Sequence, residues 1–374
     1  MLRPNRLGCL NSSLQYNQID EQIKKIGGTI YTNCFTPAPD TPRSMASFYT
    51  GLYPFQNGCT TRVKWPAKFL NPNVETIFDS FIENNFKITC FSNPNERKTG
   101  LFPQGMNLYA EHNDNFDLKG YLSDIQLKKD HLVFISIPDY HWSLQDWSYS
   151  SKGESEAIIE TSYSIDLIFD SLNKDDFDHI FLFSDHGFKF SMERRTEPQF
   201  EFINRDRTNI FLLHREKGQT ELTFNDKFSS IKDIKTSVDS MFNKEGRYSL
   251  LSGEERDYII IEDHYSTLAP TVNQNLDLWG VVQKEQIYIR TLQGAISLNW
   301  DNKIISEDVS EELDSLLIES SQFGVYLNEY NKVFAYKSLL MKQTLHMNGR
   351  PRLNVKKNYL KILYYIFLDY LKKF

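Results

Sequence analysis

The sequence DTPRSMASFYTGLYP, residues 40–54, predicts a tight turn that leads into a helix. Thr41 suits the N-cap and Pro42 the first helical position, whereas Gly51 is typical of a helix end. A hydroxyl at a helix N-terminus faces unpaired N–H groups and the positive end of the helix dipole. This environment favours an alkoxide and an anionic substrate such as a phosphate or sulfate ester. A plain surface cap is the alternative interpretation.

Composition limits the classes of function that the chain can have. Of its 374 residues, 40% are hydrophobic and 24% are charged, which is an ordinary globular balance with ample material for a core. The net charge of −7 argues against a nucleic-acid surface, so any recognition of phosphate or sulfate is local. The four cysteines have no metal-binding spacing, and we expect free thiols in a reducing compartment: Cys9, Cys34, Cys59 and Cys90.

The two ends of the chain favour a cytoplasmic location. Residues 1–6 are not followed by the apolar run of a signal peptide, although a start further upstream would change this expectation. Residues 359–371 come nearest to a membrane span, but Lys361 and Asp369 interrupt them. We expect this segment to be a helix that packs on the body or on another subunit of a homo-oligomer. A membrane-surface helix is the alternative.

Apolar strands alternate with helices through the first half of the chain. Strands that are apolar on both faces indicate an α/β fold, with a mostly parallel central sheet and helices on both faces. In such a sheet the functional site lies beyond the carboxyl ends of the strands. The expected strands are residues 27–34, 87–92, 131–137, 179–184 and 209–213.

The pattern changes after about residue 254. Short alternating strands follow, which predict a smaller antiparallel sheet, and the sequence from residue 307 onward is mostly helical in pattern. We therefore expect a catalytic core over residues 1–253, a small antiparallel subdomain over 254–305 and a helical extension over 306–374.

Two of the expected strands end in an Asp and a His. Asp185 and His186 lie in the turn SDHG, and Asp139 and His141 lie in PDYH. Carboxylate and imidazole groups are the usual oxygen and nitrogen ligands for zinc or manganese. A turn with a hydrogen-bonded histidine explains either pair alone, whereas two pairs at one sheet edge, beside a helix-capping Thr, favour an active site.

The order of these motifs resembles the alkaline phosphatase/sulfatase superfamily, in particular its sulfatase-like branch. In that family the nucleophile stands nine residues before the Thr of a Thr-Gly-x-Tyr-Pro segment, which residues 50–54 match, and this register gives Thr41. The metal-binding Ser/Thr-Asp-His-Gly turn of the family resembles residues 184–187, and its Asp-x-His strand end resembles residues 139–141. The resemblance extends over residues 2–300.

The residue type at position 41 separates the branches of this family. Formylglycine sulfatases carry Cys or Ser there, within Cys/Ser-x-Pro-x-Arg, and Pro42 and Arg43 are displaced from that register. Thr41 resembles the phosphodiesterase, phosphoglycerol-transferase and phosphoethanolamine-transferase branches, in which Thr attacks phosphorus and a phosphothreonine passes the group to water or an alcohol. The resemblance implies a metal-dependent hydrolase or transferase for phosphate esters, with sulfate esters as the alternative.

The resemblance also bears on the start of the sequence. Residues 2–10, LRPNRLGCL, resemble a family segment that follows a central β-strand ending in acidic metal ligands, and Met1 stands where those acids would finish. A start further upstream and an incomplete metal site are both open explanations. A missing carboxylate would weaken binding of a cation, and a missing central strand would expose the sheet edges that it pairs.

The resemblance assigns roles to the strand-end residues. We expect Thr41 to be the nucleophile, activated by a divalent ion (Mn, Zn, Ca or Mg) that Asp185 and His186 hold together with Thr41. Asp139 and His141 are expected to hold a second ion, unless His141 protonates the leaving alcohol instead.

Two further residues of the opening stretch have expected roles. Arg43 is expected to bind a substrate oxygen, because a guanidinium suits phosphate geometry, with a surface position as the alternative. Ser44 is the alternative nucleophile. The expected substrate is a small-molecule, glycan-linked or lipid-linked phosphate or sulfate ester. The alternative function is a catalytically impaired family member that acts as a binding or scaffold protein.

Overall fold

A computed structural model describes most of residues 2–328. One compact unit spans Met1–Gly324, and a second unit, Val325–Phe374, lies almost entirely outside the described residues. The described residues are 2–59, 70–71, 73–91, 107–109, 117–146, 151–188, 203–265, 276–291, 294–301, 303–321, 323–325 and 327–328.

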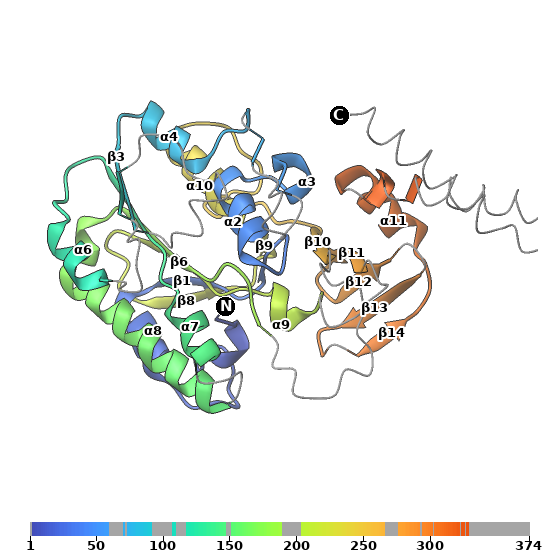
Figure 1. Cartoon of the computed structure of the whole chain (residues 1–374), viewed down its shortest axis with the longest axis horizontal. Coiled ribbons are helices and arrows are strands. Elements are labelled where there is room, and N and C mark those ends of the chain that lie inside the picture. Colours follow the sequence, from blue (N-terminus) through green and yellow to red (C-terminus); the bar gives the residue numbers. More distant parts are fainter. Residues whose placement is uncertain are drawn as a thin grey trace, which may run out of the picture. The chain divides into compact units, whose positions relative to one another are not determined.

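The strands of the first 230 residues form three sheets (Figure 1). The first sheet has the order β4-β3-β5 and is parallel throughout. The second has the order β6-β7-β1-β8, and the third is the short parallel pair β2-β9. The strands are β1 (Gly28–Tyr31), β2 (Cys34–Phe35), β3 (Lys87–Phe91), β4 (Asn107–Tyr109), β5 (His131–Ile135), β6 (His179–Phe183), β7 (Leu212–Glu216), β8 (Leu222–Asn225) and β9 (Ser229–Ser230).

Helices cover both faces of these strands, as Figure 1 shows for α7 and α8 on one side and α2, α4 and α10 on the other. One apolar core lies on the α2 face and includes Phe48 and Phe78, and another lies on the α1 and α8 face and includes Ile23 and Leu213. The helices are η1 (Pro4–Arg6), α1 (Gln18–Ile26), α2 (Thr41–Thr50), α3 (Pro54–Asn57), α4 (Ile77–Glu83), α6 (Leu118–Asp124), α7 (Asp139–Asp146), α8 (Ser151–Ser171), η2 (Lys174–Asp176), α9 (Arg205–Thr208) and α10 (Asp233–Met241).

The expected α/β fold is confirmed, with one difference in strand direction. β7 runs antiparallel to both of its neighbours, β6 and β1. The chain leaves β7, reverses in a short turn around Gly218 and returns as β8, which pairs in parallel with the distant strand β1. Since β8 and β1 run the same way, β7 on the other side of β1 runs the opposite way.

The expected C-terminal antiparallel sheet is also confirmed. Its strands pair in sequence order, β10-β11-β12-β13-β14, and α11 (Glu311–Ser320) packs against β11. Trp279 is completely buried beneath Phe323, with ring centroids 5.1 Å apart. The domain boundaries near residues 253 and 305 stay predictions. The strands are β10 (Ile259–Tyr265), β11 (Leu276–Val282), β12 (Gln286–Arg290), β13 (Ala295–Asn299) and β14 (Ile304–Ser306).

Candidate active site

Thr41 is the first residue of α2 rather than its cap. The N-cap is Asp40, whose side chain accepts a hydrogen bond from the backbone N–H of Arg43 at 3.3 Å. The prediction that Thr41 caps the helix is therefore wrong, because the longer Asp40 carboxylate reaches the unpaired N–H groups first. As a result, the Thr41 hydroxyl is left for other partners. Gly51 ends the helix in the left-handed conformation, as expected.

The partners of Thr41 are the residues that follow β6. The Thr41 hydroxyl donates to Asp185 Oδ2 at 2.5 Å, and His186 Nε2 lies 3.2 Å from the same hydroxyl oxygen. His186 Nε2 also lies 3.4 Å from Asp185 Oδ2, so an oxygen, a carboxylate and an imidazole nitrogen form a small triangle. Thr41 and Asp185 are 144 positions apart in sequence, and the helix start and the strand end bring them together.

The turn that carries Asp185 and His186 is held on two sides. Ser44, one turn into α2, donates from its hydroxyl to the backbone carbonyl of Asp185. Gly187 packs so closely that a Cβ atom there would lie 2.0 Å from the backbone oxygen of Asp206. The glycine of the SDHG motif is thus required by close approach of the backbone. Ser44 is completely buried in this bonding role, which does not favour it as a nucleophile.

The hydrogen bonds of His186 fix which ring nitrogen carries hydrogen. Nδ1 lies 2.8 Å from the backbone carbonyl of Gly187, and a carbonyl can only accept, so Nδ1 carries the hydrogen. Burial lowers the pKa of His186 and favours the neutral ring, which leaves a lone pair on Nε2 beside Thr41. Burial opposes ionisation of Asp185. The His186 ring, the Thr41 hydroxyl and the His186 backbone N–H outweigh it and hold the pKa of Asp185 below its usual range.

Asp139 and His141, the two expected site residues of the PDYH turn, have different surroundings. Both lie in the first turn of α7, and His141 is close enough to Asp185 to interact with it electrostatically. Burial, followed by the neighbouring His186, lowers the pKa of His141. Asp139 instead interacts with Ser164 of α8, and burial raises its pKa. Its Oδ2 atom is buried without a hydrogen-bond partner among the described residues. A metal-binding role of Asp139 stays a prediction.

Arg43 lies inside the molecule, with no solvent exposure. Its guanidinium donates to Asp40 Oδ2, and to Asp263 Oδ1 on β10 at 2.8 Å. The arginine thereby joins the start of α2 to the antiparallel sheet, and a direct contact with substrate stays a prediction. Sequence reasoning missed Asp263, whose only signal is a charged residue near the end of an apolar strand.

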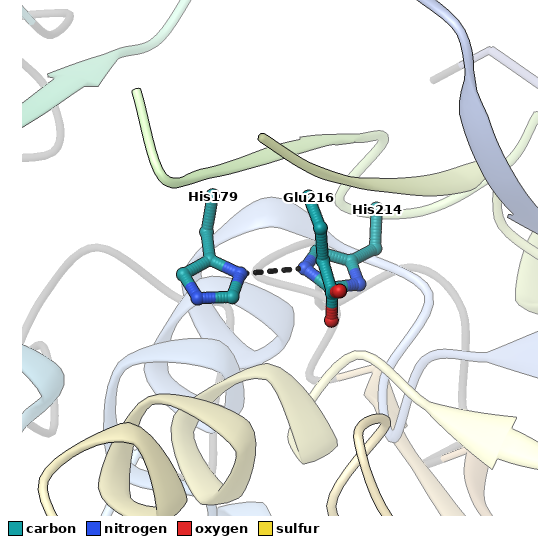
Figure 2. Close-up of side chains that lie close together, drawn as sticks. All are labelled: His179, His214 and Glu216. Carbon is teal, nitrogen blue, oxygen red and sulfur yellow. Dashed lines mark hydrogen bonds between the residues drawn. The ribbon is translucent and has the colours of Figure 1, made fainter. Parts of the chain in front are cut away.

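A second group of ligand-type side chains lies at the other end of β6, where His179 is six residues before Asp185, a span of about 20 Å at the usual strand rise. Figure 2 shows His179, His214 and Glu216, in which His179 Nδ1 and His214 Nε2 share a hydrogen bond of 3.2 Å. Ligand atoms of the three residues lie within 4.8 Å of one another, and no other such group is found in the described part of the chain. Burial, with His179 second, lowers the pKa of His214 to about 4.

One prediction falls outside the described residues. It concerns the segment 359–371, with its expected packing on the body or on another subunit, or its contact with a membrane surface. Among the helices that are described, none has both the length and the apolar character needed to cross a bilayer.

Comparisons with known proteins rest on structure alone. No family model and no curated protein sequence matches the chain. Solved structures do match. A 2-O GAG sulfatase superposes with a TM-score of 0.60 at 13% identity, over 91% of this chain and 89% of that chain. The phosphonate monoester hydrolase of Agrobacterium radiobacter superposes with a TM-score of 0.61 at 11% identity, over 91% and 94% of the two chains.

A third solved structure also matches. It is a protein of the alkaline phosphatase superfamily from Vibrio parahaemolyticus, with a TM-score of 0.57 and 12% identity over 84% of this chain and 81% of that chain. At such low identity the matches show the fold. They show that the chain has the fold that sulfatases share with the alkaline phosphatase superfamily.

Proposed function

We propose that the protein is a metal-dependent hydrolase or transferase that acts on phosphate or sulfate esters through Thr41. The observation that carries this proposal is the 2.5 Å hydrogen bond from the Thr41 hydroxyl to Asp185, made at the N-terminus of a ten-residue helix. A hydroxyl in this position has an acceptor for its hydrogen and faces the positive end of the α2 dipole.

The residues at this point suit a divalent cation (Mn, Zn, Ca or Mg). Three donor atoms, Thr41 Oγ1, Asp185 Oδ2 and His186 Nε2, lie within 3.4 Å of one another. The other ring nitrogen of His186 donates to a backbone carbonyl, which is the usual way that a protein orients a metal-binding imidazole. A bound ion would lower the pKa of the Thr41 hydroxyl and neutralise charge on the substrate oxygens.

Each step of the reaction is assigned to a residue of the chain. Thr41 Oγ1 forms a bond to the phosphorus or sulfur of the ester, and the bond to the leaving oxygen breaks. The hydroxyl proton passes to solvent water, because the lone pairs of its neighbours Asp185 Oδ2 and His186 Nε2 would be engaged by the ion. His141 supplies a proton to the leaving alkoxide. Water or an alcohol then takes the group from Thr41, which regenerates the hydroxyl.

Arg43 positions the nucleophile without touching it. Because Asp40 and Asp263 both bind its guanidinium, Arg43 fixes the first turn of α2 and so the position of the Thr41 hydroxyl. Glycan, lipid-linked and small-molecule esters all remain candidate substrates. The sulfatase among the matched structures is named for a GAG, a sugar polymer, which supports a glycan ester as the first substrate to assay.

The test is a paired assay of a chromogenic phosphodiester and a chromogenic sulfate ester. Thr41→Ala should abolish hydrolysis and Thr41→Ser should retain part of it, whereas Thr223→Ala on β8 should behave as the parent. Mass spectrometry of quenched reactions should find the transferred group on the peptide that contains Thr41. Hydrolysis by Thr41→Ala at the parent rate would refute the proposal.

A second candidate function is a binding or scaffold role without catalysis. The favouring observation is the turning of Asp139 toward α8, which leaves three donor atoms around Thr41 among the described residues. Metal content of the purified chain separates the two candidates. About one ion per chain that is lost in Asp185→Asn supports the enzyme, and a metal-free chain that binds an ester without turnover supports the scaffold.

A further inference from the structure

Three side chains that can hold a cation meet at the end of the sheet that lies away from Thr41. His179 is the first residue of β6, and its register partner on β7 is Glu216. His214 precedes Glu216 by two residues, so the pleat of the strand places both on the same face of the sheet. Figure 2 shows the three side chains pointing the same way from the two strands, and we call them the β6/β7 cluster.

The spacing of the two histidines matches that of two ligands on one tetrahedral ion. His179 Nδ1 and His214 Nε2 lie 3.2 Å apart. Zinc binds imidazole nitrogen at roughly 2.0–2.1 Å, so two such bonds that meet at the tetrahedral angle hold their nitrogens about 3.3 Å apart. An ion can therefore replace the hydrogen that two neutral rings share. The donating ring then carries that hydrogen on its other nitrogen, and no proton is gained or lost.

The β6/β7 cluster combines one fixed ligand with two that can adjust. His214 is buried, and its ring stacks on Phe181 with the ring centroids 4.5 Å apart. Burial lowers the pKa of His214 to about 4, so the ring is neutral at pH 7 and offers a lone pair. His179 is half-buried and Glu216 is exposed, so both can turn. The ligand atoms of all three lie within 4.8 Å of one another, and a rotamer change of Glu216 closes this to tetrahedral spacing.

The basic residues beside Glu216 do not compete with an ion for its carboxylate. Arg215 and Lys217 flank Glu216 in sequence, and alternate residues of a strand point to opposite faces of the sheet. The Arg215 guanidinium donates a hydrogen bond to Asp175, and the Lys217 ammonium lies 3.6 Å from Asp178. The Glu216 carboxylate therefore supplies negative charge on the face that carries the two imidazoles.

The donor set selects the class of ion. Two imidazole nitrogens and one carboxylate oxygen suit Zn²⁺ and similar ions such as Co²⁺, whereas Mg²⁺ and Ca²⁺ prefer oxygen ligands throughout. Three protein ligands leave the fourth tetrahedral position to water. Because Glu216 is exposed, water and the ion can both reach this position from solvent.

We propose that the β6/β7 cluster is a zinc site, in which His179, His214 and Glu216 hold one Zn²⁺ with water as the fourth ligand. β6 is the first strand in the described order β6-β7-β1-β8, and the ion joins the beginning of β6 to the end of β7. The ion thus fastens this end of the strand pair, at the opposite end of β6 from Asp185. The inference does not depend on the chemistry of Thr41.

The first experiment measures Zn²⁺ binding to the full chain by equilibrium dialysis. Asp185→Asn is the starting chain, so that an ion held beside Thr41 does not contribute. It should bind about one Zn²⁺, and millimolar Mg²⁺ should not compete. Adding His179→Gln should weaken Zn²⁺ binding at least about 100-fold, because loss of a partner behind a ligand already costs about 10–100-fold. Parent affinity in this double variant would overturn the proposal.

Matched variants in the same Asp185→Asn chain test each assigned ligand. Glu216→Gln keeps the size of an exposed side chain and should also weaken Zn²⁺ binding, by at least about tenfold. His131→Gln is the control, since it removes a half-buried histidine at the start of β5 that is not part of the cluster. His131→Gln should keep the affinity. Unchanged affinity in Glu216→Gln, or an equal loss in His131→Gln, would contradict the assigned ligand set.

The second experiment locates the ion in the chain that retains Asp185. Zn²⁺ should slow amide hydrogen exchange at least about tenfold at the beginning of β6 and the end of β7, with β12 and β13 unchanged. His179→Gln should remove this protection and leave ester hydrolysis at the parent rate. Protection of the two strand ends that persists in His179→Gln would rule out the zinc site. Since hydrolysis is measured separately, its absence in the parent would count against the proposed function alone.

Discussion

Arg43 Nη2 lies 2.8 Å from Asp263 Oδ1, and both side chains are completely excluded from solvent. The two residues are 220 positions apart, and they join the helix that carries Thr41 to the first strand of the antiparallel sheet. Removing one partner of a buried pair leaves an uncompensated charge, which is far more destabilising than loss of an exposed pair.

Asp263→Ala should therefore lower the free energy of unfolding by roughly 3 kcal/mol, with Asp40 limiting the loss because it still contacts Arg43. Urea denaturation measures the change. The matched control is Asp178→Ala, which removes a largely exposed partner of Lys217 and should leave the midpoint unchanged. Equal midpoints for the two variants would mean that the Arg43–Asp263 pair does not stabilise the fold.

Ser44→Ala should reduce activity without removing the covalent intermediate. Ser44 bonds the backbone carbonyl of Asp185 and the hydroxyl of Thr36, so its loss loosens the turn beside Thr41 and destabilises the fold by about 1–2 kcal/mol. Quenched reactions should still carry the transferred group on Thr41. A label that disappears in Ser44→Ala and persists in Thr41→Ala would reverse the two assignments.

His141→Gln should lower kcat by an amount that depends on the leaving group of the substrate. A nitrophenolate leaves without help, whereas an alkoxide needs a proton as the bond breaks. The variant should therefore lose about 100-fold in kcat with alkyl esters and less than about tenfold with nitrophenyl esters. Steady-state rates across a series of leaving groups check this. A uniform loss across the series would indicate that His141 binds the substrate or an ion instead of donating the proton.

Gly187→Ala should disrupt the turn that holds Asp185. The new Cβ would lie 2.0 Å from the backbone oxygen of Asp206, and backbone on both sides must shift. We expect a loss of at least about 2 kcal/mol in stability, together with most of the activity. Gly253→Ala is the control, because a Cβ atom at that position would meet nothing within 4 Å. Similar thermal midpoints for both variants would contradict the close approach.

Local sequence patterns predicted many of the strands and helices and part of the candidate site. The apolar runs at residues 131–137 and 179–184 contain β5 and β6, and the rule that sites lie beyond strand ends pointed to Asp185. The features that the sequence could not show are contacts between residues far apart in the chain. The partner of Arg43 lies 220 residues away, and the direction of β7 depends on a pairing with β1 that no local period encodes.

The acid sensitivity of the fold should depend on His214, which is 4% exposed and stacks on Phe181 at 4.5 Å. Burial lowers its pKa to about 4, with the neighbouring His179 adding to the effect, whereas an unfolded histidine titrates near 6.5. Between these two values the unfolded chain binds a proton that the folded chain does not. The free energy of unfolding should therefore fall as the pH drops from about 7 to about 4, by up to roughly 3 kcal/mol from this group. His214→Gln should flatten that part of the stability profile, measured by urea denaturation at each pH. Thr223→Ala on β8, which changes no titratable group, should keep the parent slope, and an equal slope in His214→Gln would show that another group causes it.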